Sequence, residues 1–293
     1  MSTGDECMKM AESKLQDNSW FSWFMGVPNE YTMISVHHLY IIAVNLYRKE
    51  AYKYIIDESF TDAANTFIKI ADIQLNKLND ELSAAENYIN SAKIMKKYDD
   101  IAAIQYFEKA IELYNRNGNF GMGAKISETI AGIAEKNNMT DCTILAYQNA
   151  YKYYTCAFSE FSAITVLEKL TQILINTFQY ELAFVNFDKL ASYHKRNLST
   201  HDEYKNCLFD SFICKIFVND LQETKNELLK YKNSNDEFAK TTEYNYLIKF
   251  IDVYEQHDVE GYWSLINNFN SYYRFHEWHQ KLFVNLIDRI NKK

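Results

Sequence analysis

Few residues in this sequence have the types and spacing that catalysis or metal binding requires. His276, Glu277 and His279 form an H-E-x-H pattern, whereas the zinc motif of metalloproteases separates its two histidines by four positions. His37 and His38 are adjacent, so on a helix they point in different directions and are poor joint ligands for a metal. The sequence therefore predicts neither a metal site nor another cofactor.

Nucleophiles and phosphate-binding loops are equally poorly represented. The five cysteines include no C-x-x-C pair, and Cys207 and Cys214 are seven residues apart, on one face of a helix. This pattern favours reduced, buried thiols in a cytosolic protein over disulfides or a metal site. Gly118, Gly121 and Gly123 lack the Lys-Ser/Thr pair of a P-loop. We expect a protein that is not an enzyme.

Composition excludes several other classes. The formal net charge of −8 disfavours a nucleic-acid binder. One proline and seven glycines among 293 residues indicate many helices and few turns, and a hydrophobic content of 47% indicates an ordered chain. The first residues are polar and charged, and no apolar run reaches the ~20 residues of a membrane span. The chain is therefore expected to be cytoplasmic.

A helical hairpin over residues 103–135 organises the remaining elements. Ile104, Phe107 and Tyr114 lie on one apolar stripe, and a second stripe follows the break at Asn117-Gly118. Similar helices recur about every twenty residues, with a small or apolar residue at Ala71, Ala92, Ala110, Ala131, Ala150, Leu170 and Leu190. The pattern predicts an all-α fold, a tetratricopeptide-like right-handed superhelix of antiparallel helix hairpins with a C-terminal helical bundle.

The N-terminal segment is rich in aromatic residues. A short helix is expected over 5–16, and a loop closed by Gly26 and Pro28 follows it. Rings of this kind favour the membrane–water interface, which supports an exposed loop that contacts a membrane. The alternative is a loop folded back onto the first hairpin. The expected divisions are 1–30 for this segment, 31–200 for the repeat sheet and 201–293 for the terminal bundle.

Acidic residues gather near the C-terminal end, where 250–260 contains Asp252, Glu255, Asp258 and Glu260 and no lysine or arginine. Such a run is typical of a solvated helix face and its turn. The functional alternative is an acidic docking patch for a basic partner.

Taken in order, these features resemble the family of alpha soluble NSF attachment proteins. The likeness covers nearly the whole chain. It rests on four stretches, 64–67, 102–114, 123–125 and 255–278, the last of which ends in Arg274-Phe275-His276-Glu277-Trp278. The resemblance implies an adaptor in vesicle-mediated transport, including ER–Golgi transport. Such an adaptor binds the syntaxin-containing SNARE bundle left after membrane fusion and recruits the NSF ATPase, which disassembles it.

The resemblance also implies positions for three contacts of a peripheral protein on the cytosolic face of membranes. Membrane attachment falls on Trp20, Phe21, Trp23, Phe24 and Met25. SNARE binding falls on Arg48, Lys96, Lys97, Lys125 and Lys169. NSF binding falls on Asp220, Asp252 and Glu255.

This chain departs from the family pattern at several positions. Asn119 and Thr165 stand where basic residues are expected, and Gln256 replaces an acid. The sequence ends on Asn291-Lys292-Lys293, where the family has an acidic tail. Two alternatives therefore stay open: a divergent adaptor or decoy that binds SNAREs and activates NSF weakly, and a generic helical-repeat scaffold that binds peptides.

Overall fold

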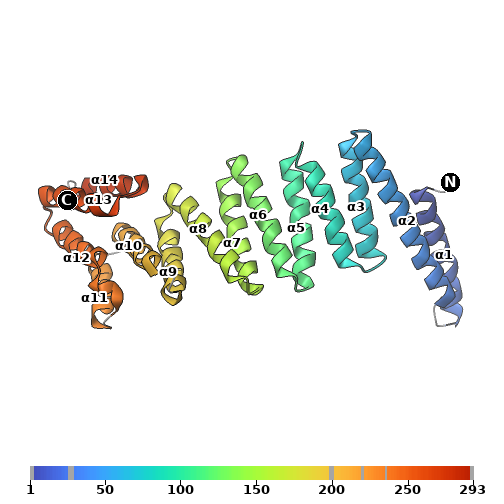
Figure 1. The fold of residues 1–293 in the computed structure, drawn as a ribbon. Coiled ribbons are helices and arrows are strands. Elements are labelled where there is room, and N and C mark those ends of the chain that lie inside the picture. The colour runs from blue at the N-terminus through green and yellow to red at the C-terminus, as the bar shows by residue number, and fades with distance from the viewer. Residues whose placement is uncertain (1–2, 26–29, 198–200, 219–220, 235, 291–293) are drawn as a thin grey trace. The chain divides into compact units, whose positions relative to one another are not determined.

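The computed structural model describes the backbone of residues 3–25, 30–197, 201–218, 221–234 and 236–290, without the side chains of 17–25, 201, 289 and 290. Every regular element in these ranges is a helix (Figure 1). The helices are α1 (Gly4–Met25), α2 (Glu30–Ile56), α3 (Phe60–Asn76), α4 (Glu81–Met95), α5 (Asp100–Arg116), α6 (Phe120–Lys136), α7 (Thr140–Cys156), α8 (Glu160–Asn176), α9 (Tyr180–Arg196), α10 (His201–Val218), α11 (Leu221–Asn233), the 3-10 helix η2 (Glu237–Lys240), α12 (Thr242–Glu255), α13 (Val259–Tyr273) and α14 (Glu277–Ile290). The all-α prediction is confirmed.

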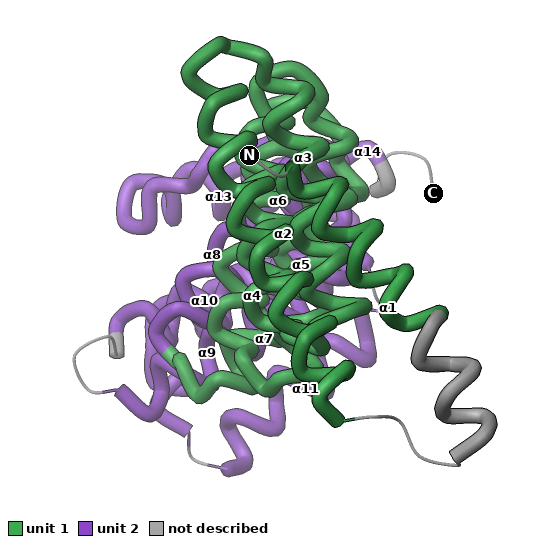
Figure 2. The backbone as a smooth tube through the Cα atoms, turned by 90° about the vertical axis from the view of Figure 1, so that its right-hand side faces the viewer, with its two compact units in different colours: residues 1–160 green, residues 161–293 purple. Residues whose placement is uncertain are grey.

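The chain forms two compact units, residues 1–160 and 161–293, which Figure 2 draws in different colours. In the first unit, α1 to α7 stand side by side in chain order as antiparallel neighbours (Figure 1). The predicted hairpin is the pair α5 and α6, with Phe107 and Ile130 buried. These stacked hairpins have the arrangement expected of a tetratricopeptide-like repeat. The three-part division at residues 30 and 200 stays a prediction.

Small residues let neighbouring helices approach closely. The seven positions that recur about every twenty residues are all buried, and the five alanines among them have no exposed surface. Because alanine combines a short side chain with high helix propensity, it suits these crossings. The predicted period is therefore confirmed in the packing.

Polar side chains fix the ends of the hairpins. Asp99 caps α5 by accepting a hydrogen bond from the Ala102 N–H at 2.9 Å. At the opposite end of α5, the Asn117 amide donates to Glu81 Oε2 at 2.6 Å. Asn137, which directly follows α6, donates to Asp100 Oδ2 at the start of α5 at 2.8 Å. Each bond joins the C-terminal end of one helix to the first turn of the helix before it, which fixes their relative position along the stack.

Four successive turns between helices each contain a residue in the left-handed backbone conformation, and these residues are twenty positions apart. They are Gly118, Asn138, Phe158 and Phe178, with φ between 54° and 70°. Glycine and asparagine tolerate this conformation, whereas a phenylalanine is strained in it. Phe158 is also 96% exposed, so burial of its ring within the chain does not offset that strain.

The expected short first helix is wrong in its length. Helix α1 runs from Gly4 to Met25, through the stretch that the sequence analysis assigned to a loop. Glycine and proline, the strong helix breakers, are absent between Gly4 and Gly26, and Pro28 follows. The density of aromatic residues was a poorer guide to the helix end than the position of these breakers.

The second unit is held together by aromatic rings. Phe269 lies at the centre of the cluster, with its ring centroid 4.0 Å from that of Tyr246 and 5.5 Å from that of Phe209. Phe275 packs on the same rings, 5.7 Å from Phe269. This cluster joins α10, α12 and α13 to Phe275 in the connection that leads to α14.

Candidate functional site

The predicted membrane-attaching residues lie in the second half of α1. The first half of this helix is anchored to α2, because Cys7 and Ala11 are buried against Tyr40 and Val44. The Tyr47 hydroxyl also donates a hydrogen bond to Asp5. The side chains of Trp20, Phe21, Trp23, Phe24 and Met25 lie outside the described residues. Their role in membrane attachment stays a prediction.

The predicted SNARE-binding residues are spread over three helices of the first unit and one of the second. Lys96 and Lys97 are exposed at the C-terminal end of α4, and Lys125 is exposed near the start of α6. The helices α4 and α6 run in the same direction (Figure 1). The C-terminal end of α4 and the start of α6 therefore lie at opposite edges of the layer of helices. Arg48 is half-buried on α2, and Lys169 is exposed on α8. Within the first unit, these cations are therefore distributed along the helices and do not form a single cluster.

Some of these positions are engaged by neighbours. The Lys97 ammonium group lies 4.3 Å from the centre of the Phe60 ring, a distance at which a cation and an aromatic face attract. At the two positions that depart from the family pattern, Asn119 precedes α6 without capping it through its side chain. The Thr165 hydroxyl donates to the Phe161 carbonyl at 3.1 Å. Neither residue supplies a positive charge.

Two of the predicted NSF-binding acids share one ammonium group. Lys225 on α11 donates to Asp252 Oδ1 at 2.8 Å and to Glu255 Oε2 at 2.9 Å. The hydrogen bond to Asp252, followed by that to Glu255, raises the pKa of Lys225 above its ordinary value. The charge of these acids is thus partly offset by a residue outside the acidic segment. Asp220 lies outside the described residues.

Another acid of the segment has a local structural role. Asp258 caps α13, since its Oδ1 accepts a hydrogen bond from the Gly261 N–H at 2.9 Å. The interpretation as a solvated helix end therefore accounts for Asp258, while Asp252 and Glu255 stay candidates for docking.

The H-E-x-H pattern forms an internal polar contact. His279 is fully buried, and its Nε2 lies 2.8 Å from Asp210 Oδ1. Its Nδ1 accepts a hydrogen bond from the His276 N–H at 3.2 Å, so the ring proton is on Nε2 and is donated to Asp210. Both ring nitrogens are thus occupied, and we find no set of three metal-ligating side chains among the described residues.

The cysteine prediction is correct in one respect and wrong in another. None of the five cysteines forms a disulfide bond, and Cys7 and Cys214 are buried, whereas Cys156 is exposed. Burial raises the pKa of Cys214 well above its ordinary value, which keeps this thiol protonated and unreactive.

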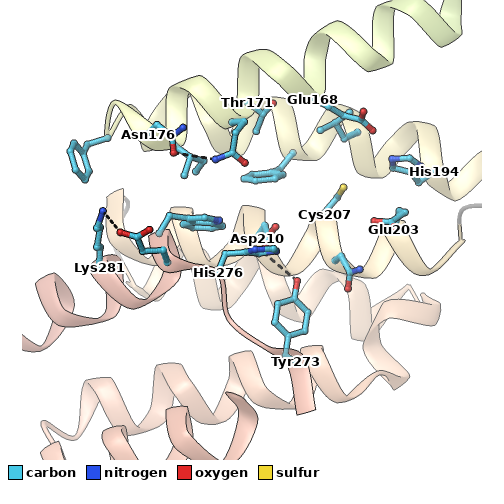
Figure 3. Close-up of a pocket in the computed structure, with 18 residues that line it drawn as sticks. Glu168, Thr171, Asn176, His194, Glu203, Cys207, Asp210, Tyr273, His276 and Lys281 are labelled. Atoms are coloured by element: carbon cyan, nitrogen blue, oxygen red, sulfur yellow. Dashed lines mark hydrogen bonds and ion pairs between the residues drawn. The ribbon is translucent and has the colours of Figure 1, made fainter. Parts of the chain in front are cut away.

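A cavity of about 660 Å³ opens in the second unit, between α8 and α9 on one side and α10 and the start of α14 on the other (Figure 3). Trp278 and Phe187 form part of its wall, with their ring centroids 6.2 Å apart. Lys281 and Glu277 form an ion pair of 2.7 Å at its edge.

Among the helices whose residues are described, none is long and apolar enough to cross a membrane.

Comparison with known protein families decides where the chain belongs. The family described as "Soluble NSF attachment protein, SNAP" matches residues 2–291.

The chain belongs to the soluble NSF attachment protein family. The resemblance inferred from the sequence is therefore confirmed over almost the entire chain.

Relatives occur in animals, fungi and a virus. The beta-soluble NSF attachment protein of Bos taurus is 25% identical over 270 residues, which are 92% of this chain and 88% of that protein. A probable vesicular-fusion protein sec17 homolog of Schizosaccharomyces pombe is 24% identical over 98% of this chain and 96% of its own length. A soluble NSF attachment protein homolog of Fowlpox virus is 26% identical over 71% of this chain and 75% of its own length.

Solved helical-repeat structures are similar as well. The alignment with the apo form of RapI covers 89% of this chain and 70% of the RapI chain, with 14% identity and a TM-score of 0.39. A second alignment is with a signal transduction ATPase that has a tetratricopeptide repeat sensor, from Pyrococcus horikoshii. It covers 99% of this chain and 44% of the ATPase chain, with 14% identity and a TM-score of 0.38.

Two features of the site have no signal in the sequence. Lys225 precedes Asp252 by 27 residues, and no motif pairs them. The cavity brings together His194, Glu203 and Trp278 from three helices. Helical periodicity indicates which residues of one helix face inward, but it does not indicate which helices meet.

Proposed function

We propose that this chain is an adaptor that binds the post-fusion SNARE bundle and recruits the NSF ATPase. The observation that carries the proposal is the family match over residues 2–291. The exposed cations Lys96, Lys125 and Lys169 then contact the acidic surface of the bundle, and Asp252 and Glu255 contact a basic surface of the ATPase. The aromatic residues at the end of α1 contact the membrane that anchors the bundle.

The net charge of the chain and its expected contact with the membrane support these roles. The chain carries a net charge of −8, so exposed lysines that face an acidic rod are needed to counter the general repulsion and to steer association. A contact with the bilayer raises the effective concentration of the adaptor beside a membrane-anchored bundle. Weak individual contacts therefore combine into stable binding.

A second candidate function is supported by the contact of Lys225 with Asp252 and Glu255. Since this ammonium group offsets part of the acidic charge, the chain would bind SNAREs while engaging the ATPase weakly. The two candidates differ in one measurable outcome: the first predicts ATP-dependent disassembly of the bundle, and the second predicts binding without disassembly.

Charge reversal tests the SNARE contact. In a pull-down with an assembled SNARE bundle, Lys125→Glu combined with Lys169→Glu is expected to weaken binding at least about fivefold, because attraction becomes repulsion at two positions. The matched control is Lys152→Glu with Lys240→Glu, which makes the same charge change at other exposed lysines. Equal loss in both pairs would show a general charge effect and would argue against the assigned surface.

Liposome flotation tests the membrane contact. Trp20→Ser with Phe24→Ser is expected to abolish most of the flotation of the wild-type chain, because the loss of aromatic rings weakens interfacial binding. Phe158→Ser serves as the control, since it removes an exposed ring from a turn of the helical stack. If the double variant floats as well as the wild type, the aromatic stretch does not attach the chain to membranes.

A further inference from the structure

The cavity of the second unit contains an acidic cluster around one thiol. Burial raises the pKa of Cys207 above its ordinary value. The further causes are the charges of three neighbouring carboxylates, Asp210, Glu203 and Glu168. All three line the cavity, Glu168 from α8 and the other two from α10. Three negatively charged side chains therefore lie near the Cys207 thiol.

The carboxylates differ in their availability. Asp210 accepts a hydrogen bond from His279 at 2.8 Å and has the Tyr273 hydroxyl 3.4 Å away, so its orientation is fixed by the protein. Glu168 and Glu203 are exposed, and neither forms an ion pair with another described residue. Their charges are therefore available to a ligand that carries a positive charge.

A buried imidazole provides the second, independent observation. His194 lines the same cavity and is 5% exposed, and its Nδ1 is buried without a hydrogen-bond partner. Figure 3 shows His194 and Glu203 on facing sides of one end of the cavity, with Cys207 beside them. A buried polar atom without a partner is unfavourable. Because this Nδ1 has almost no accessible surface, the imidazole must turn for an N–H group of a ligand in the cavity to reach it, and no hydrogen bond from Nδ1 holds the ring in place.

Apolar side chains complete the walls. Ile175, Phe187, Leu190 and Trp278 line the cavity beside the polar groups. The cation at its edge, Lys281, is paired with Glu277 at 2.7 Å. The combination of two available carboxylates, one unsatisfied imidazole and an apolar wall matches an organic cation with an aliphatic stem, whose charged end needs hydrogen-bond acceptors and whose methylene groups need apolar contact.

We propose that this cavity binds an alkylammonium or guanidinium group, with Glu168 and Glu203 as its counter-charges and His194 as a further hydrogen-bond partner. None of the lining residues is one to which a SNARE or NSF contact is assigned, although Lys169 directly follows Glu168 in α8, and the proposal does not depend on the proposed function. A lysine or arginine side chain of a protein and a free polyamine share this chemistry, and the experiment below distinguishes them.

The test uses the full chain labelled with 5-fluorotryptophan, in which Trp278 reports on the cavity and Trp278→Phe identifies its ¹⁹F signal. The probes are N-acetylarginine amide, spermidine and N-acetylcitrulline amide, the last a neutral isostere of the first. We expect saturable shifts with the cationic probes and at least about tenfold weaker binding of the citrulline compound, because charged hydrogen-bond pairs are the strong ones. Tighter binding of the arginine compound than of spermidine assigns the site to a protein side chain, and the reverse assigns it to a polyamine.

Variants connect the binding to the named residues. Glu168→Gln with Glu203→Gln is expected to weaken the cationic probes at least about tenfold. Glu181→Gln, at an exposed position of α9 that does not line the cavity, is expected to leave them unchanged. Each single variant serves in place of the double variant if the latter unfolds. An equal response to arginine and citrulline compounds, or unchanged binding in the Glu168 and Glu203 variants, would overturn the proposal.

Discussion

Lys225 on α11 donates a hydrogen bond to Asp252 on α12, with 2.8 Å between its Nζ and the Asp252 Oδ1. The same ammonium group contacts Glu255 at 2.9 Å. The family resemblance assigns both acids to NSF binding, so an intramolecular lysine competes with the basic partner for them. Removal of this lysine should therefore strengthen the contact with the ATPase.

The substitution Lys225→Gln tests this competition. We expect association with NSF, measured by surface plasmon resonance on immobilised SNARE bundles coated with the adaptor, to accelerate about threefold at low salt, because charge complementarity acts mainly on the association rate. The control is Lys230→Gln, which makes the same charge change at an exposed position of the same helix. Equal acceleration by both variants would show that net charge, and not release of Asp252 and Glu255, is responsible.

Lys215 predicts an asymmetric effect on stability. This residue is 3% exposed, and its Nζ lies 2.9 Å from Asp188 Oδ2 and 2.8 Å from Glu227 Oε1. Asp188→Asn with Glu227→Gln leaves a buried cation without a counter-charge, which should lower the free energy of unfolding by about 3 kcal/mol. Lys215→Met should cost only about 1 kcal/mol, because both carboxylates reach solvent and an apolar chain fits beside Phe212. Urea unfolding measures both, and equal losses would contradict this account of the ion pair.

The left-handed turns predict that one substitution stabilises the chain. Phe158 has φ of 54° and a ring that is 96% exposed. Phe158→Asn should raise the free energy of unfolding by about 0.5–1 kcal/mol, because asparagine tolerates this conformation. The reciprocal change, Asn138→Phe, should lower it by a similar amount at a residue with φ of 55°. Thermal or urea unfolding of the two variants provides the comparison, and shifts of the same sign would refute the strain argument.

Buried tyrosines predict a loss of stability at alkaline pH. Burial, followed by the charge of Glu135, raises the pKa of Tyr147 to about 12. Burial and nearby carboxylates likewise raise the pKa of Tyr231 to about 12. An unfolded tyrosine titrates near pH 10, so above that pH the folded chain retains protons that the unfolded chain releases.

Folding stability should therefore be fully retained below about pH 10 and should fall as the pH rises toward 12. Urea unfolding at a series of pH values, with tyrosinate absorbance recorded in parallel, measures the effect. Tyr231→Phe should make the decline shallower. Stability that rises between about pH 10 and 12 would contradict the sign of the shift.

Local patterns in the sequence predicted the helices and much of their packing. The stripe that contains Phe107 and the break at Gly118 define α5 and the turn that follows it, and both are observed. The alanines at Ala110 and Ala131 are buried as expected. These features depend on residues within one or two helical turns of one another, and such short-range information is present in a single sequence.

The errors and omissions are non-local or depend on weak local signals. The density of aromatic residues suggested an early end to α1, although no glycine or proline lies between Gly4 and Gly26. The pairing of Lys225 with Asp252, and the meeting of His194 with Glu203 in one cavity, depend on how whole helices pack. No periodicity encodes such encounters, so they appear only when the helices are placed in three dimensions.

The most direct measurement of the central claim is the rate at which NSF disassembles a fluorescently labelled SNARE bundle in the presence of ATP, with and without this chain. The account predicts that the wild-type chain accelerates disassembly, that Lys125→Glu with Lys169→Glu slows it, and that Lys152→Glu with Lys240→Glu does not. A rate equal to that of NSF alone, in the presence of a wild-type chain that is bound to the bundle, would contradict the claim that this chain recruits the ATPase productively.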